Sequence, residues 1–157
     1  MRLPILDKLE NDLMASKKEL EVDIPKALKI ATDMGDLSEN AEYKAAKERQ
    51  MFLQSRVSQL QKRIGDIISI DLNRIPKDRS GLGSTLVLKH VDSGAEKKFF
   101  LVFPEEVDPE LGKISMASPI GKRLAGKMEG DEIEVPVEGE TQSYEVVQII
   151  TIHQENG

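Results

Sequence analysis

The sequence predicts an α+β protein in two parts: a hairpin of two antiparallel helices, then a small domain of antiparallel strands with one helix. Between positions 5 and 72, apolar residues recur at alternating spacings of three and four, which is typical of paired helices. Beyond position 83 the pattern changes to short runs of β-branched and aromatic residues. Three of the four phenylalanines lie in this second part, so we expect the larger hydrophobic core there.

The first helical arm has an apolar stripe with Ser16 at one of its positions; the other members are Leu6, Leu9, Leu13, Leu20 and Ala27. Pro25 interrupts this arm. A proline inside a helix removes one backbone hydrogen bond and kinks the helix. We therefore expect a bend or short break near 22–25, with Asp23 capping the restarted helix.

The second arm repeats the heptad spacing through Leu53, Val57, Leu60, Ile64 and Ile67. Two apolar stripes separated by a turn pair most simply as an antiparallel coiled-coil hairpin. Each arm of about 30 residues is roughly 45 Å long, at 1.5 Å per residue. The hairpin is therefore expected to be thin and long, with its turn at one end.

Residues 73–83 have the composition of a linker, so we divide the chain into a hairpin at 1–75 and a second domain at 76–157. Asp92-Ser93-Gly94 is a turn signal between two strands. Strands are expected at 84–91, 97–103, 113–116, 131–137 and 143–153. The single helix of this domain is expected at 118–127, begun by Ser118-Pro119 and ended near Gly126.

The composition excludes several functions. The 157 residues include no cysteine, which excludes disulfides, thiolate zinc sites and thiol catalysis. The two histidines, His90 and His153, lie in segments expected to be strands, where structural roles are the common case. No apolar run approaches the roughly 20 residues of a membrane helix, and the acidic N-terminal segment is a poor signal peptide. We expect a soluble, cytoplasmic protein without membrane contact.

The charge is distributed unevenly along the chain. The net charge of −6 comes entirely from residues 76–157, because acids and bases are equal in number in residues 1–75. A sequence pI of about 5.1 argues against free nucleic acid as the main ligand.

The turn between the helical arms, at 33–42, is acidic. It contains Asp33, Asp36, Glu39 and Glu42, and no basic residue. Asp36 and Glu39 are three residues apart, so at the start of a helix they lie on one face and can share a hard cation such as Mg²⁺. The same spacing is that of a capping box opening the second helix, which is the commoner explanation of the pattern. The two interpretations are compatible.

The second arm is basic. From Tyr43 to Arg63 there is one acid and six bases: Lys44, Lys47, Arg49, Arg56, Lys62 and Arg63. This stripe can follow a phosphate backbone, with Lys47 close enough to the tip to hold RNA there. The alternative is a solvated helix face whose lysine stems cover apolar surface.

Residues 35–43 read GDLSENAEY, and residues 118–127 read SPIGKRLAGK. Both motifs resemble those of GreA-type transcription elongation factors of the Gre family, and the first is similar to the family's hairpin tip. The second, followed by Gly130-Asp131-Glu132, is similar to the signature of its FKBP-like C-terminal domain. The motifs stand in the family's order, and the resemblance covers essentially the whole chain. It implies a C-terminal domain that docks on polymerase and does not isomerise prolines.

The resemblance implies a bacterial transcript cleavage factor. Such a factor binds backtracked RNA polymerase through its secondary channel and stimulates the polymerase's own Mg²⁺-dependent cleavage of the nascent RNA 3′ end, which rescues arrested complexes. It is not itself an enzyme and holds no tightly bound cofactor. Contact with DNA is expected to be weak or indirect.

The resemblance also assigns roles to individual residues. Asp36 and Glu39 match the acids that assist the polymerase's magnesium, with Asn40 and Glu42 as supporting tip residues. Lys47 and Lys44 match contacts to the RNA. Ser118, Pro119 and Ile120 are the candidates for docking on the polymerase.

One segment departs from the family pattern. Ala31-Thr32-Asp33-Met34 stands where the family often has a basic residue and a Glu-His-like pair. We expect a weaker grip on longer backtracked RNA, and Asp33 adds an acid near the tip. Two alternatives remain: a Gre-fold inhibitor that occupies the channel without promoting cleavage, and a prolyl isomerase or chaperone acting through residues 76–157.

Overall fold

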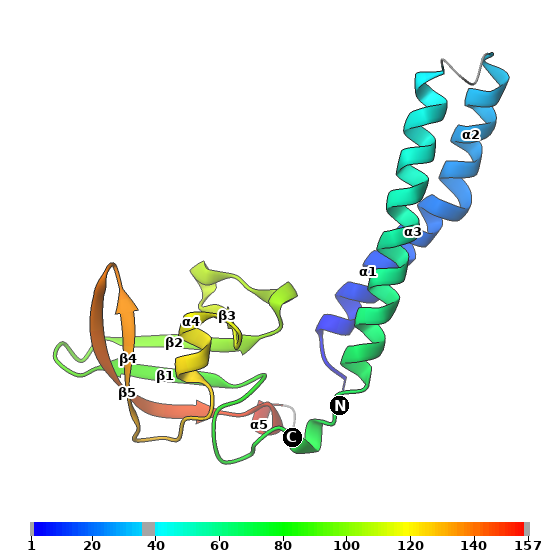
Figure 1. The fold of residues 1–157 in the computed structure, drawn as a ribbon. Coiled ribbons are helices and arrows are strands. Elements are labelled where there is room, and N and C mark those ends of the chain that lie inside the picture. The colour runs from blue at the N-terminus through cyan, green and yellow to red at the C-terminus, as the bar shows by residue number, and fades with distance from the viewer. Residues whose placement is uncertain (1, 36–39, 156–157) are drawn as a thin grey trace. The chain divides into compact units, whose positions relative to one another are not determined.

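The computed structural model describes residues 2–35 and 40–155, which divide into two compact units (Figure 1). The first unit, Arg2–Ile70, is helical, and the second, from Asp71 onward, is built on a sheet. Within the described ranges, no helix is both long enough and apolar enough to cross a membrane.

The helical unit is an antiparallel hairpin. Its first arm runs from α1 (Ile5–Lys18) through a π-helix (Glu19–Asp23) into α2 (Ile24–Asp33). Its second arm is α3 (Ala41–Ile68), whose 28 residues span about 42 Å at 1.5 Å per residue. The predicted stripe of α3 is confirmed: it is buried against the first arm, with only Val57 partly exposed.

The first arm differs from the prediction at the proline. The chain does not break near 22–25, and Asp23 makes no capping hydrogen bond; instead the helix continues through the π-helix directly before Pro25. There the Ile24 N–H donates to the Glu19 carbonyl five residues earlier. The wider turn accommodates the proline ring, which in a regular helix clashes with a carbonyl in the preceding turn.

The π-helix also shifts the apolar stripe. A π-helical turn contains one residue more than an α-helical turn. Every residue after it is therefore displaced by one position relative to the heptad pattern. Ile24 and Ala31 are buried, whereas Ala27, which heptad spacing assigns to the interface, is exposed.

The second unit contains a five-stranded sheet in the order β3-β2-β1-β5-β4. The strands are β1 (Thr85–His90), β2 (Glu96–Val102), β3 (Lys113–Ser115), β4 (Glu132–Val137) and β5 (Glu140–Ile150). All pairings are antiparallel except that of β2 with β3, which is parallel. Two short 3-10 turns, each beginning with a proline, carry the chain from β2 back to the start of β3 instead of forming a hairpin.

The core of this unit lies on one face of the sheet. Leu86, Leu101 and Val146 are fully buried there, together with Leu124 of the helix α4 (Pro119–Leu124). The predicted α+β class is therefore confirmed.

The last predicted strand is too long. β5 ends at Ile150, and a short helix α5 (Ile152–Glu155) follows, so His153 is helical. Gln154 Oε1 accepts the Thr151 N–H at 2.8 Å, which fixes the first turn of this helix. His153 Nε2 lies 2.8 Å from the Ile75 carbonyl oxygen, while His90 Nδ1 accepts the N–H groups of the adjacent turn. Both histidines therefore have structural partners.

Candidate functional site at the hairpin tip

The second arm begins four residues later than the capping-box interpretation requires, since its N-cap is residue 40 and not residue 36. α3 starts at Ala41, and Asn40, with extended backbone, is its N-cap: Asn40 Oδ1 accepts the Tyr43 N–H at 3.0 Å. The prediction that Asp36 and Glu39 form the capping box of this helix is therefore wrong. Asp36 and Glu39 themselves lie outside the described residues.

The same asparagine reaches the other arm. Its Nδ2 donates to the Ala31 carbonyl at 2.6 Å, in the last turn of α2. That carbonyl also accepts the Met34 N–H at 3.2 Å. The carbonyls of a final helical turn lack regular helical partners, and here one of them accepts both a local N–H and a side-chain donor from the start of the opposite arm.

The first arm ends at a glycine. Gly35 has φ of +126°, a conformation that side-chain-bearing residues rarely adopt. Immediately before it, Asp33 and Met34 are exposed, and Thr32 Oγ1 donates back to the Leu28 carbonyl at 2.7 Å. The chain therefore leaves α2 through a turn that glycine favours.

The described tip residues do not form a metal site by themselves. Glu42 is exposed in the first turn of α3, where a carboxylate complements the helix dipole. Across residues 2–35 and 40–155, no three acidic or histidine side chains come close enough to hold a metal ion. Any metal site at this tip therefore needs ligands beyond the described side chains.

Several bases of α3 are paired with acids. Arg49 donates to both carboxylate oxygens of Glu19, at 2.6 and 2.8 Å. These hydrogen bonds lower the pKa of Glu19 and raise the pKa of Arg49. One heptad further along, Arg56 lies 3.8 Å from Asp12 on the first arm. The antiparallel hairpin thus uses these arginines to connect its own arms.

Another base is paired within α3, and two lie near the tip. Lys62 lies 3.5 Å from Asp66. Lys44 and Lys47 are exposed in the first two turns of α3. Lys47 Nζ lies 5.9 Å from the centre of the Tyr43 ring and 3.4 Å from Gln50 Oε1. These two lysines are available for a phosphate-bearing ligand close to the tip.

The C-terminal signature has a structural basis. Ser118 Oγ accepts the Gly121 N–H at 3.0 Å and donates to the Ser115 carbonyl at 2.6 Å, so Ser118 caps α4. A Cβ at Gly121 would overlap the Ser115 carbonyl oxygen. Ile120 packs partly buried against the core, while Pro119 is exposed. Of the three docking candidates, Pro119 is the exposed one.

Sequence reasoning missed Ser80, which it assigned to a linker. Ser80 is buried, and its Oγ donates to the Leu124 carbonyl at 2.5 Å and accepts the Lys127 N–H at 2.8 Å. The residue closes the C-terminal end of α4 from a distant part of the chain. Its only signal in the sequence was a serine beside glycine.

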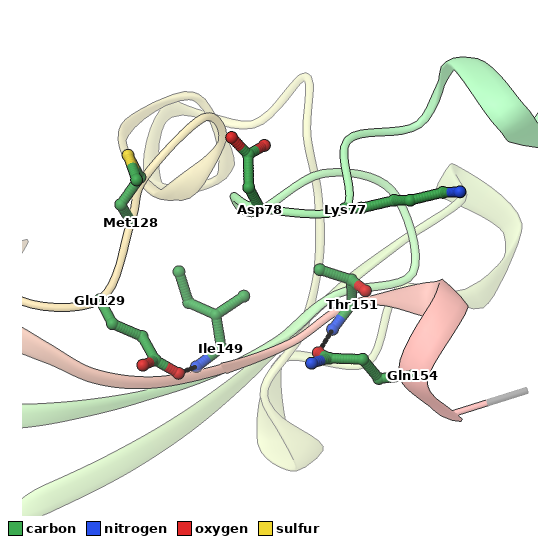
Figure 2. Close-up of a pocket in the computed structure, with 7 residues that line it drawn as sticks. All are labelled: Lys77, Asp78, Met128, Glu129, Ile149, Thr151 and Gln154. Carbon is green, nitrogen blue, oxygen red and sulfur yellow. Dashed lines mark hydrogen bonds between the residues drawn. The ribbon is translucent and has the colours of Figure 1, made fainter. Parts of the chain in front are cut away.

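A cavity of about 250 Å³ lies between residues 77–78 and the end of β5 (Figure 2). Among the lining residues, Glu129 Oε1 accepts the Ile149 N–H at 3.0 Å, and Gln154 Oε1 accepts the Thr151 N–H. These two lining residues, Glu129 and Gln154, therefore support the backbone around the cavity.

Two family models match the chain. Residues 75–151 match the model described as transcription elongation factor, GreA/GreB, C-term, and residues 5–67 match the model described as transcription elongation factor, N-terminal. Together they cover both units.

Two relatives named transcription elongation factor GreA match most of this chain. A transcription elongation factor GreA from Desulfotalea psychrophila is 38% identical over 144 residues, covering 92% of this chain and 89% of its own. One from Nitratidesulfovibrio vulgaris is 40% identical over 142 residues, covering 90% and 86%. The solved GreA factor homolog 1 of Thermus thermophilus is 26% identical, covers 92% of this chain and 94% of its own, and has a TM-score of 0.43.

Proposed function

Because this chain belongs to the GreA/GreB family of transcription elongation factors, we propose that it stimulates transcript cleavage by backtracked bacterial RNA polymerase. In this proposal the hairpin enters the polymerase's secondary channel and brings the tip to the polymerase active site. The polymerase then cleaves the 3′ end of its own nascent RNA, and the arrested complex resumes elongation. The factor supplies side chains and is not itself the enzyme.

The observation that carries the proposal is the construction of the tip. α3 is capped by Asn40, so the fold does not require Asp36 or Glu39 as its N-cap. Both acids precede the cap in the sequence, between two helix ends joined by Asn40. Asp36 and Glu39 are therefore not needed as a capping box for α3, which favours a functional role for the two acids.

The proposed chemistry is phosphodiester hydrolysis with metal ligands supplied by a second protein. Magnesium at the polymerase centre activates water and stabilises the charge on the leaving oxygen. Asp36 and Glu39 would offer carboxylate oxygens to it, which are the ligands Mg²⁺ prefers. Two carboxylates are too few to hold the ion tightly on the isolated factor, so we propose no resident cofactor.

The remaining roles fall on both units. Lys47 and Lys44 are proposed to contact the RNA, because Arg49 and Arg56 already form ion pairs with acids of the first arm. The segment Ser118-Pro119-Ile120 is proposed to dock on the polymerase, mainly through the exposed Pro119.

The test is a cleavage assay on halted polymerase complexes. The wild type is expected to shorten the RNA, and Asp36→Ala with Glu39→Ala to reduce the rate at saturating factor by a factor of about 100 or more, because the metal-assisting ligands are lost. Binding of the variant to polymerase should persist, as measured by competition with the wild type.

The matched control is Glu42→Ala with Asp33→Ala, which removes the same charge from exposed positions flanking the pair. We expect a much smaller effect, because the proposal gives these acids at most a supporting role. Equal cleavage by the Asp36/Glu39 variant and the wild type rejects the assignment. A wild type that slows elongation without releasing 3′ fragments is an inhibitor instead.

A further inference from the structure

We propose that Asn40 is the positioning residue of the tip, acting through one side chain that is hydrogen-bonded to both arms. Its Oδ1 accepts the Tyr43 N–H at the start of α3, and its Nδ2 donates to the Ala31 carbonyl at the end of α2. The inference rests on the proposed function, in which the acids between these helix ends must meet a metal centre.

The geometry requires an amide. A helix N-cap needs only an acceptor, which serine, threonine or aspartate provides equally well. The bond to the opposite arm needs a donor on the same side chain, at a reach that serine lacks. Asparagine carries both groups on one rigid plane, and Asn40 uses both while half-buried.

The two hydrogen bonds of Asn40, which we call the Asn40 bridge, lie where the two arms have little other contact. The arms are connected further down by Arg49 and Glu19, thirty residues apart in sequence, and by the apolar stripe. At the tip the stripe narrows to the small residues Ala31 and Ala46, which contribute little packing. The Asn40 bridge therefore holds the two helix ends at the point where the apolar interface is thinnest.

Positioning of this kind changes the rate and not the affinity. Misplacing a reacting group by about 1 Å can cost a factor of about 100 in rate. Without the hydrogen bond from Asn40 to Ala31, the tip should therefore still enter the polymerase, but it should present its acids in a poorer geometry. It should also need more magnesium to reach half of its maximal rate.

The test compares Asn40→Ser and Asn40→Asp, which keep an N-cap acceptor and lose the donor to Ala31. Thr32→Ala is the control, because it removes a side-chain hydrogen bond of similar length within one arm. We expect both Asn40 variants to bind polymerase within twofold of the wild type. Their saturating cleavage rate should fall about tenfold or more, and the magnesium concentration at half-maximal rate should rise. Thr32→Ala should change neither quantity.

A second measurement does not depend on polymerase. Amide hydrogen exchange in the free protein should show Tyr43 still protected in both Asn40 variants and exposed in Asn40→Ala. If Asn40→Ser and Asn40→Asp both cleave at the wild-type rate with the wild-type magnesium dependence, the inference is wrong and the proposed function is unaffected. A loss of cleavage explained wholly by weaker polymerase binding overturns it too. A wild type that does not cleave removes the proposed function and this inference with it.

Discussion

Ser80 closes a helix that lies 44 residues further along the chain. Its hydroxyl bonds the Leu124 carbonyl and the Lys127 N–H, and its backbone bonds Lys127 and Gly126. A helix end leaves carbonyls unpaired, and inside a protein each unpaired group carries a cost in free energy. The motif at 118–127 therefore depends on a residue outside it.

We expect Ser80→Ala to lower the free energy of unfolding of the sheet unit by about 1–3 kcal/mol, because the buried Leu124 carbonyl and the partly buried Lys127 N–H lose their partner. Urea unfolding measures this. Ser143→Ala, at an exposed position of β5, is the matched control and should change it by less than about 0.5 kcal/mol. Equal stability of the two variants would show that the Ser80 hydroxyl contributes nothing.

Among the elements, the first helical arm is the unusual one, since it contains a π-helix next to a proline. Because the π-helix adds one residue to the arm, the stripe beyond it is displaced by one position, from Ala27 to Leu28. The exposed residue Val22 belongs to this insertion.

Deleting Val22 together with Pro25→Ala should convert the π-helix to α-helix and leave the hairpin folded. The deletion restores an unbroken heptad stripe, so the free energy of unfolding should change by less than about 1 kcal/mol. Deleting Ser58, an exposed residue of the regular α3, is the control. It displaces half of that stripe and should unfold or strongly destabilise the hairpin. Circular dichroism during thermal unfolding distinguishes the two outcomes.

The pair between Glu19 and Arg49 makes hairpin stability depend on pH. The pKa of Glu19 is lowered by its hydrogen bonds from Arg49, so the folded state favours the carboxylate. Such a group stabilises the fold above the ordinary carboxyl pKa, and this contribution is lost as pH falls through the lowered pKa.

Thermal unfolding from pH 7 down to 2 should therefore show a steeper loss in the wild type than in Glu19→Gln. Glu21→Gln, an exposed substitution in the same π-helix, should follow the wild type. Identical pH profiles for the wild type and Glu19→Gln would mean that this pair does not stabilise the hairpin.

At the scale of the whole molecule, the two units have different roles in the proposed function. In this proposal, the hairpin tip would determine the rate of cleavage, and the sheet unit would determine how tightly the factor binds polymerase. A group that acts in the reaction alters the saturating rate, whereas a docking group alters the concentration needed to reach it.

Pro119→Ala tests this division. We expect about a three- to tenfold rise in the factor concentration at half-maximal cleavage, with the saturating rate unchanged, because an exposed docking contact is removed. Pro136→Ala, an exposed proline on β4, is the control and should alter neither value. If Pro119→Ala lowers the saturating rate instead, the division of roles is wrong.

Features that repeat locally could be predicted from the amino-acid sequence. The heptad spacing of α3 predicted its buried stripe, and alternating runs predicted the strands, because periods of 3.5 and 2 reflect the geometry of each element alone. The tip acids Asp36 and Glu39 were found from their spacing and from a family motif. Their assignment remains a prediction.

Contacts between residues far apart in the chain could be identified only in the folded structure. Asn40 bonds Ala31 nine residues away, Arg49 bonds Glu19 at thirty, and Ser80 bonds Leu124 at 44. The parallel pairing of β2 with β3 belongs to the same class. Such partners leave no periodic trace in the sequence, because what brings them together is the packing of separate elements.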